Sequence, residues 1–284
     1  MKLSIITVCL NDKNIERTCK SICSQNFDDF EWIIIDGKSN LETIKTIQKY
    51  KEKISKFISE KDSGIYDAMN KGILVSTGEY VSFMNAGDCF YLPDTLSNIF
   101  NKNFYQSDIL YGDVEIVKNR KTVIEKNPKN ITKQFFLYGT INHQACFIKK
   151  DLFLKYGLYN LRYKTASDFE KLILWEKNGC SFKYLNQIVA IHYRNGISSN
   201  KKIVKNEWRK IKKEYYSRQD KKLFNSKYQI NFCGIKLLSI KDIFPKKYVN
   251  LFGLIPILKI RKNLIYLFGL NFLPILKIKE NINE

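Results

Sequence analysis

Three aspartates stand where an apolar run ends or a helical pattern begins, and carboxylates at such places can do chemistry. Asp36 closes the run Phe30–Asp36, and Asp88 follows the run Tyr80–Met84 in a turn of small residues. Asp168 opens an apolar helical pattern. A carboxylate there can accept hydrogen bonds from a ligand, bind a hard metal ion or take a proton. The ordinary alternatives are a turn aspartate or a helix N-cap.

The first 90 residues must position Asp36 and Asp88, and their pattern alternates between strand and helix. Apolar, β-branched runs predict strands, and apolar residues at helical spacing predict the helices between them. The predicted strands are Leu3–Leu10, Phe30–Asp36, Ile54–Ser59 and Tyr80–Met84. The predicted helices are Asn14–Ser24, Leu41–Tyr50 and Ile65–Val75. This alternation implies parallel βαβ units, in which ligands bind beyond the carboxyl ends of the strands.

From about residue 108 the pattern changes. SDILYGDVEIV and KTVIEK predict an antiparallel pair, and HQACFIKK predicts a further strand before a helix that starts at Asp151. ASDFEKLILWEKNG predicts a helix that stops at Gly179, and SFKYLNQIVAIHYR predicts a last strand. We therefore predict that residues 1–200 form one mixed α/β domain.

The segment 201–284 differs from this domain in charge and in repetition. It carries 20 Lys and Arg against 6 Asp and Glu, so most of the chain's net charge of +20 lies in it. A predicted helix, KKIVKNEWRKIKKEYYSRQDKK, precedes three imperfect repeats, NFCGIKLLSI, LFGLIPILKI and LFGLNFLPILKI. The basic charge predicts an anionic partner. Two interpretations of the repeats stay open: short strands or hairpins packed on the domain, or apolar side chains inserted shallowly into a membrane.

Composition excludes several classes of protein. Apolar residues make up 44% of the 284 residues, which is enough for a sizeable core and argues against general disorder. Seven cysteines without a C-x-x-C pair favour reduced thiols in a cytosolic setting. The start MKLSIITVCLND predicts a buried strand better than a signal peptide, and the apolar run Leu264–Leu276 is too short to span a membrane. No P-loop, G-x-G-x-x-G or serine-elbow motif is present.

Residues 1–200 resemble family 2 glycosyltransferases of the GT-A type, the inverting kind that uses nucleotide-sugar donors. The matching stretches, in the family's order, are SIITVCLN, CKSICSQNFDDFEWIIIDGKSN, DSGIYDAMNKGILVSTGEYVSFMNAGD, HQACFIKKDLF and TASDFEKLILW. The third stretch is similar to the subgroup that assembles bacterial capsule, lipopolysaccharide and exopolysaccharide. The resemblance implies a GT-A fold, a mixed and mostly parallel sheet flanked by helices, here followed by a basic C-terminal appendage.

The resemblance also implies contacts to the donor. It assigns Asp36 to the nucleotide base and Asp88 to Mn²⁺ or Mg²⁺, which would offset the charge of the leaving diphosphate. The family's metal motif is Asp-x-Asp, whereas the first carboxylate position here holds Asn85 or Ala86. Ala86 and Gly87 are small, so the backbone can approach the sugar.

Further donor contacts are expected around the helix that follows Asp62. Asp62 either contacts the base or ribose or acts as an N-cap. Asp67 and Asn70 on the helix are expected to face the donor, and Lys71 either reaches a phosphate or stays solvated.

On the acceptor side, the resemblance assigns Asp168 as the base that takes the acceptor hydroxyl proton. Glu170 is a competitor, and an N-cap role is the alternative. His143 and Gln144 match the family's HQ pair and are expected to contact the acceptor or a phosphate.

The end of the last predicted strand offers two further candidates. His192 can supply another metal ligand, and Arg194 can bind the diphosphate.

Together these features predict a metal-dependent inverting glycosyltransferase that moves a sugar from a nucleoside diphosphate, expected to be UDP, to a lipid-linked surface glycan. The expected location is cytoplasmic, peripheral at the inner face of the membrane, with the basic tail on anionic lipid. Nucleic acid is not an expected partner. The alternative is a non-catalytic basic protein that binds membrane or nucleic acid on the same scaffold.

Overall fold

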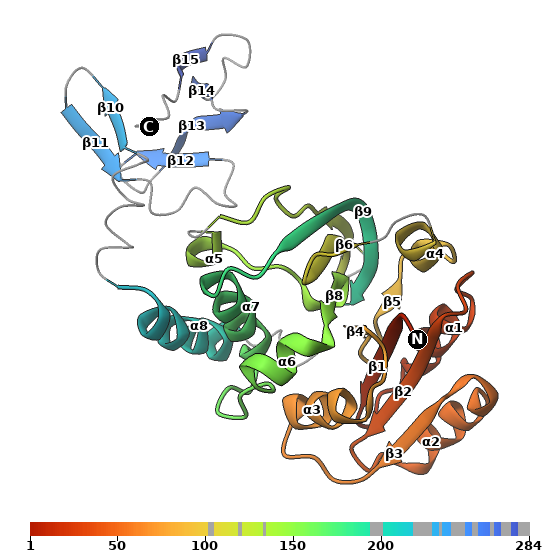
Figure 1. Cartoon of the computed structure of the whole chain (residues 1–284). Coiled ribbons are helices and arrows are strands. Elements are labelled where there is room, and N and C mark those ends of the chain that lie inside the picture. Colours follow the sequence, from red (N-terminus) through yellow and green to blue (C-terminus); the bar gives the residue numbers. More distant parts are fainter. Residues whose placement is uncertain are drawn as a thin grey trace. The chain divides into compact units, whose positions relative to one another are not determined.

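The computed structural model (Figure 1) describes residues 1–284 apart from 102–104, 119–120, 133–134, 194–200, 218–228, 233–234, 240–247, 252–254, 262–263, 268–273 and 278–284. It divides into two compact units. One comprises residues 1–133 and 140–211, and the other residues 134–139 and 212–284. The division lies inside helix α8 (Lys201–Tyr215) rather than at residue 200.

The larger unit is built on one sheet, which has nine strands within the described residues, in the order β3-β2-β1-β4-β8-β6-β9-β5 with β7 paired to β6. The strands are β1 Leu3–Cys9, β2 Phe30–Asp36, β3 Lys56–Ser59, β4 Tyr80–Phe83, β5 Cys89–Phe90, β6 Ile109–Lys118, β7 Lys121–Glu125, β8 Cys146–Lys149 and β9 Phe182–Tyr193. Strands β1–β4 run parallel, as do β6 and β9, whereas β8 is antiparallel to β4 and β6. The mixed, largely parallel sheet predicted from the sequence is therefore confirmed.

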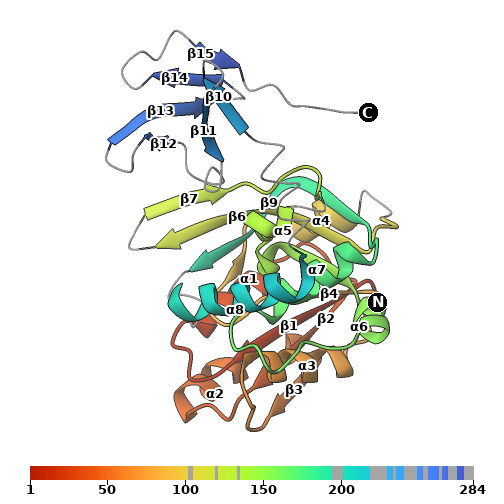
Figure 2. The ribbon, with the colours of Figure 1, turned by 90° about the vertical axis from the view of Figure 1, so that its left-hand side faces the viewer.

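Helices connect these strands. They are α1 Ile15–Cys23, α2 Leu41–Gln48, α3 Ile65–Val75, α4 Thr95–Phe100, α6 Lys150–Tyr156 and α7 Ser167–Lys177, with 3₁₀ turns η1 Lys51–Lys53 and η2 His143–Ala145. Asn40 caps α2 by accepting a hydrogen bond from the Thr43 N–H. Figures 1 and 2 both show α7 and α8 side by side, and the rings of Phe169 and Trp208 stack there at 4.3 Å.

Strands β1, β2 and β4 are apolar along most of their length because they are buried in the core. All seven residues of β1 are buried, and its neighbours β2 and β4 are buried along almost their whole length. Helix α3 lies so close to β1 that a Cβ on Gly72 would stand 2.5 Å from Ile6 Cγ2. This packing holds the carboxyl ends of β1, β2 and β4 at one edge of the sheet.

Three differences from the predicted elements have simple causes. HQACFIKK is not one strand, because its first three residues form η2 and only Cys146–Lys149 pairs in the sheet. Helix α2 ends at Gln48, and η1 follows. β5 and α4 were not predicted, since two and six residues are too short for a periodic pattern.

The smaller unit contains α5 (Phe135–Tyr138) and short antiparallel strands. Its strands are β10 Gln229–Phe232, β11 Ile235–Ser239, β12 Tyr248–Leu251, β13 Ile255–Arg261, β14 Leu264–Leu267 and β15 Pro274–Lys277. Parts of the three repeats lie on β11, β13 and β15, which agrees with the hairpin interpretation of their backbone. None of the helices in the described ranges has both the length and the apolar composition of a membrane span.

Candidate active site

Two adjacent residues of η2 reach two aspartates that lie far apart in the sequence. The His143 Nδ1 atom is 3.3 Å from Asp168 Oδ2, and Gln144 donates from Nε2 to Asp88 Oδ2 at 3.0 Å. Asp88 follows β4, whereas Asp168 lies in the first turn of α7. One 3₁₀ turn therefore brings the predicted metal residue and the predicted base into a single site.

The Asp168 carboxylate is held at both oxygens. Tyr66 donates its hydroxyl to Oδ1 at 2.5 Å, while His143 lies at Oδ2. Burial by itself would raise the pKa of Asp168, but the contacts with His143 and Tyr66 outweigh it and lower that pKa. Burial, followed by the nearby Asp168 charge, raises the pKa of Tyr66 well above its usual value, so Tyr66 stays a hydrogen-bond donor. Asp168 is thus an ionised carboxylate with 19% of its side chain exposed.

Asp88 is held by groups from two other elements. Its Oδ1 accepts a hydrogen bond from the Tyr193 N–H at 3.1 Å and lies 3.0 Å from His192 Nδ1, both on β9. Thr18 of α1 donates its hydroxyl to the Asp88 backbone carbonyl at 2.7 Å. The predicted pair of Asp88 and His192 is therefore side by side, with 7% and 12% of the two side chains exposed.

A carboxylate oxygen and an imidazole nitrogen can both bind a divalent cation, and here Asp88 Oδ1 and His192 Nδ1 lie at hydrogen-bond distance, with Gln144 Nε2 2.9 Å from the same Nδ1. Two ligands of an octahedral Mg²⁺ or Mn²⁺, each about 2.1 Å from the ion, lie about 3.0 Å apart at right angles. Asp88 Oδ1 and His192 Nδ1 have this spacing. In the part of the chain that the structure describes, no group of three or more His, Cys, Asp and Glu could hold a metal. An ion held by Asp88 and His192 would therefore need its other ligands from a substrate and water.

Residues near Asp88 that the sequence did not single out add positive charge. The Arg17 guanidinium lies over the Tyr193 ring, 3.7 Å from its centroid, and donates to the Gly87 carbonyl at 3.3 Å. Gly87 has φ +93°, a backbone conformation that residues with a Cβ rarely adopt. The backbone of this turn therefore favours glycine at residue 87. Arg17 is one of several basic residues near α1, and no pattern in the sequence distinguishes it.

A second cluster joins the ends of β2 and β3 to α3. Lys71 Nζ lies 2.7 Å from Asp62 Oδ1, 2.8 Å from Glu60 and 3.7 Å from Asp67. Lys71 donates hydrogen bonds to the carboxylates of Asp62 and Glu60, which raises the pKa of Lys71, so it stays charged. A Cβ on Gly37 would stand 3.0 Å from Asp62 Oδ2, which places Asp62 beside the turn after β2. Lys71 is therefore paired rather than solvated.

Other predicted donor residues have local partners. Asp36 is fully buried and accepts hydrogen bonds from the Ser59 hydroxyl at 2.6 Å and the Ser39 N–H at 3.0 Å. Asp67 accepts the Ser63 N–H at 2.8 Å, as an aspartate in the first turn of a helix often does. Contacts of Asp36 and Asp67 with a donor stay predictions.

The Asn70 side chain bonds to the backbone of Tyr159. Its amide donates to the Tyr159 carbonyl and accepts the Tyr159 N–H, both at 2.9 Å. Both polar groups of this side chain thus bind the loop before α7, and a contact of Asn70 with the donor stays a prediction.

Four further candidates remain to be placed. Asn85 lies beside His143, with Nδ2 at 3.2 Å from Nε2, and Ala86 is partly buried next to it. Glu170, the competitor for the base, is buried and accepts a hydrogen bond from Asn160 at 3.2 Å. Arg194 lies outside the described residues.

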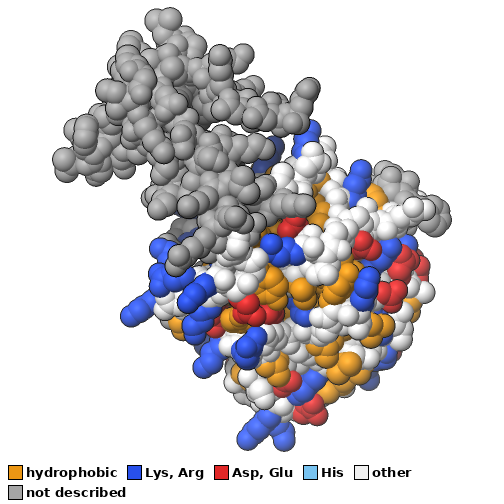
Figure 3. Space-filling view, turned by 60° about the vertical axis from the view of Figure 1, so that its left-hand side comes forward, with side chains coloured by type: hydrophobic (Ala, Val, Ile, Leu, Met, Phe, Trp, Pro, Cys, Tyr) orange, Lys and Arg blue, Asp and Glu red, His pale blue; other side chains and the backbone are white. Residues whose placement is uncertain are grey.

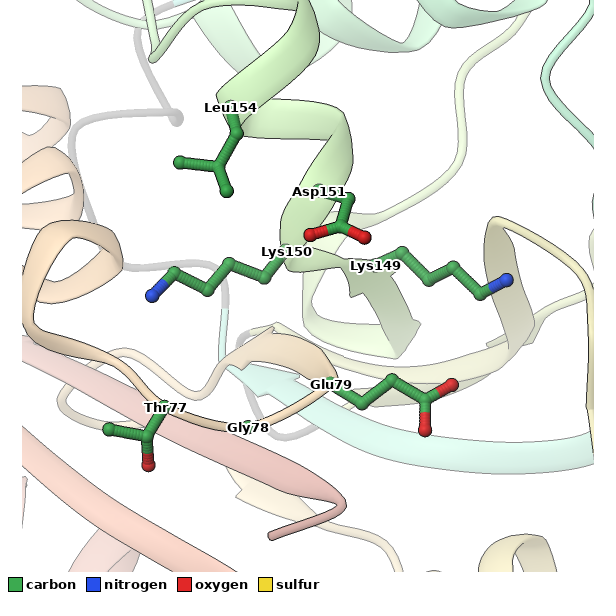
Figure 4. Close-up of a pocket in the computed structure, with 7 residues that line it drawn as sticks. All are labelled: Thr77, Gly78, Glu79, Lys149, Lys150, Asp151 and Leu154. Atoms are coloured by element: carbon green, nitrogen blue, oxygen red, sulfur yellow. The ribbon is translucent and has the colours of Figure 1, made fainter.

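A cavity of about 390 Å³ lies at the opposite end of β4 (Figure 4). It is lined by Thr77, Gly78, Glu79, Lys149, Lys150, Asp151 and Leu154. Thr77–Glu79 precede β4, whereas Asn85–Asp88 follow it. In Figure 4 the side chains of Lys149 and Lys150 extend in opposite directions, and each donates to a backbone carbonyl, of Gln106 and Ser76 respectively. This cavity is separate from the aspartate site.

Residues 4–160 match the model of the family described as "Glycosyl transferase family 2". The chain belongs to glycosyl transferase family 2. A relative in this family, the "PGL/p-HBAD biosynthesis glycosyltransferase" of Mycobacterium bovis, is 32% identical over 204 residues, which are 69% of this chain and 78% of the relative. A protein of Rickettsia felis described as an uncharacterized glycosyltransferase is 27% identical over 81% of this chain and 37% of its own length.

Solved structures of similar fold come from more distant proteins. S. aureus TarS residues 1–349 in complex with UDP has a TM-score of 0.57 at 19% identity, over 68% of this chain and 60% of that one. The mannosyltransferase PcManGT of Pyrobaculum calidifontis, in complex with GDP-Man and Mn²⁺, has a TM-score of 0.54 at 15% identity, over 75% of this chain and 61% of that one. The chain thus spans about three fifths of the length of these structures. The predicted GT-A fold and the prediction of a glycosyltransferase enzyme are confirmed.

Proposed function

We propose that this family 2 enzyme transfers a sugar, with inversion, from a nucleoside diphosphate donor to a glycan acceptor. The observation that carries the proposal is the pair His143 and Gln144, which hold Asp168 and Asp88 in one site. UDP is the donor nucleotide we favour, because UDP and UDP-GlcNAc are bound in TarS, a protein of the same fold. Family membership argues against the non-catalytic alternative.

In this proposal Asp168 is the general base. Its carboxylate is ionised and partly exposed, and Tyr66 fixes its orientation. The acceptor hydroxyl becomes acidic as its oxygen bonds to the anomeric carbon, so a base with a lowered pKa can still take the proton. The oxygen attacks from the face opposite the diphosphate, which gives inversion.

On the donor side, Asp88 and His192 would hold the Mn²⁺ or Mg²⁺ ion. A divalent ion there supplies positive charge to the leaving diphosphate. Arg17 would add a permanent positive charge beside the same turn, and its stacking on Tyr193 limits its movement. We propose Asp62 with Lys71 as the site of the nucleoside, because they flank the turn after β2.

Donor turnover and transfer, measured with a panel of UDP-sugars and Mn²⁺, test this function. Asp168→Asn should leave donor affinity within a few-fold and lower transfer by ~10²–10⁴. Glu170→Gln is the matched control. Glu170 accepts a hydrogen bond from Asn160, so this variant should retain most of the transfer activity. If Asp168→Asn transfers sugar at the wild-type rate, or if Glu170→Gln alone abolishes transfer, the assignment of the base is wrong.

Metal dependence has its own test. Asp88→Asn should lower donor turnover at least ~100-fold, and EDTA should have the same effect on the wild type. Turnover that is unaffected by EDTA would mean that Arg17 and other cations neutralise the leaving group instead.

We also propose that the acceptor is lipid-linked and that the C-terminal segment 201–284 binds the inner face of the membrane. Helix α8 carries the exposed basic residues Lys202, Lys205, Arg209, Lys210 and Lys213, while Trp208 stacks on Phe169. Figure 3 shows Lys and Arg side chains gathered along the left-hand edge of the described part of the protein. Anionic headgroups attract such residues at ~1 kcal/mol each near the surface.

Sedimentation with liposomes tests the membrane proposal. Full-length protein should bind anionic vesicles, bind neutral vesicles weakly, and dissociate as salt is added. Reversing two charges with Lys205→Glu and Arg209→Glu should weaken binding, whereas Lys51→Glu, an exposed lysine in η1, should not. Equal binding by the α8 variant and the control would exclude α8 as the contact. We keep residues 1–200 as the proposed catalytic domain, since all the described site residues lie in the larger unit.

A further inference from the structure

Asn85, His143 and Asp168 form a row of hydrogen-bonded side chains from three separate elements. Asn85 follows β4, His143 lies in η2 and Asp168 in α7. Asn85 Nδ2 is 3.2 Å from His143 Nε2, and His143 Nδ1 is 3.3 Å from Asp168 Oδ2. Both ring nitrogens therefore have a partner, and 19% of the His143 side chain is exposed.

The chemistry of the partners selects one form of the imidazole. An amide nitrogen only donates, so with Asn85 Nδ2 facing the ring, Nε2 is the unprotonated, accepting nitrogen. The proton of a neutral ring then lies on Nδ1, where it points at Asp168 and is donated to the carboxylate. In this direction of the Asn85 amide, Nδ2 faces His143, and Oδ1 is buried without a partner among the described residues.

We propose that Asn85 and His143 are positioning residues for the base: Asn85 holds His143 as the Nδ1–H tautomer, and His143 orients the Asp168 carboxylate toward the acceptor. This inference rests on the proposed function, because it presupposes that Asp168 is the base. A carboxylate at residue 85 would accept a proton from Nε2 and would reverse the hydrogen bond.

The tautomer can be measured in the wild-type protein. The sequence contains two histidines, His143 and His192, so long-range ¹H–¹⁵N correlation of the ¹⁵N-histidine-labelled protein gives two ring patterns, and His192→Asn assigns them. We expect His143 to show a protonated Nδ1 and an unprotonated Nε2 at neutral pH. A ring protonated at Nε2 alone, or at both nitrogens, overturns the proposal without any variant at Asn85.

Kinetics of matched variants test the positioning role. His143→Ala should lower kcat of transfer by ~10²-fold with little change in donor KM, because a displaced base costs about this factor. His143→Asn should recover much of kcat, since an asparagine amide nitrogen can occupy the place of Nδ1, whereas His143→Gln should not. An equal loss in all three variants, or a rise in acceptor KM with unchanged kcat, would mean that His143 contacts the acceptor and would overturn the proposal.

Asn85→Asp is the sharpest variant, because it changes the polarity of one hydrogen bond at almost constant shape. We expect a doubly protonated His143 ring and a fall in kcat of about 10-fold or more, as for other groups that orient a functional residue. Asn142→Asp, an adjacent amide whose Nδ2 has no partner among the described residues, is the control. Unchanged kcat and tautomer in Asn85→Asp, or an improvement in metal activation, would refute the role.

The same assays separate failure of this inference from failure of the proposed function. If Asp168→Asn transfers sugar at the wild-type rate, the proposed base is wrong. If Asp168→Asn is inactive but His143→Ala keeps its kcat, only the positioning role is wrong.

Discussion

Replacing Tyr66 by phenylalanine should change the pH dependence of both activity and stability. The Tyr66 hydroxyl donates to Asp168 Oδ1 at 2.5 Å, and this bond is among the contacts that lower the pKa of Asp168. A hydrogen bond to a charged group contributes about 1.5–3 kcal/mol. Tyr66→Phe removes this bond and should therefore raise the pKa of Asp168.

The sign of both effects follows from the lowered pKa. The ionised form of Asp168 is the base, so the acid limb of kcat/KM for transfer should move to higher pH in the variant. The stabilisation by Tyr66 is present above the pKa of an unfolded aspartate, about 3.9, and is lost as the pH falls through the lower folded value. At pH 7 the variant should therefore lose about 1.5–3 kcal/mol in free energy of unfolding, and the difference should shrink below pH ~4.

Two measurements and one control test this reasoning. The pH profile of kcat/KM locates the acid limb, and urea unfolding at neutral and acidic pH gives the stability difference. Tyr159→Phe is the control. The Tyr159 ring lies 5.3 Å from the Tyr66 ring, and removing the Tyr159 hydroxyl leaves the hydrogen bond from Tyr66 to Asp168 intact. An acid limb that stays in place, or that moves equally in both variants, would show that Tyr66 does not tune the base.

Three further changes have defined outcomes. Asp62→Asn should raise donor KM with kcat nearly constant, because its ion pair with Lys71 lies at the proposed nucleoside site; an unchanged KM in steady-state kinetics would place the nucleoside elsewhere. Gly72→Ala should destabilise the protein by about 1–3 kcal/mol in urea unfolding, since its Cβ would stand 2.5 Å from Ile6 Cγ2, and no loss would mean that α3 can shift. Glu207→Ala should cost about 1–3 kcal/mol, because the carboxylate accepts both the N–H and the hydroxyl of Thr165; a stability equal to wild type would refute this.

The sequence predicts the first half of the fold well because its signals there are local. The runs Phe30–Asp36 and Ile65–Val75 have the same bounds in the structure as in the pattern. A strand that is buried on both faces must be apolar at nearly every position. A helix that packs against it needs apolar residues at helical spacing. The strand pairing of β6 and β7 follows in the same way from two runs separated by a short turn.

The site was predictable only in part, because its contacts join distant segments. Asp88, His192 and Gln144 could be named as candidates, and the structure brings them together across 56 and 104 positions in sequence. Tyr66 and Arg17 could not be distinguished. Each stands in a helix where no local pattern marks it as functional, and only the approach of α7 and β9 gives them their partners.

Asp36 and Asp88 show why position at a strand end is not enough to assign a role. Asp36 ends β2 and Asp88 follows β4 of the same sheet. Asp36 accepts hydrogen bonds from its own turn and the neighbouring strand, whereas Asp88 is bound by groups of η2 and β9. Local partners can hold a carboxylate in any parallel sheet, whereas partners from separate elements create a place where a ligand can meet several groups at once. The apolar pattern predicts which residues stand at the edge, and the long-range packing decides which of them share a site.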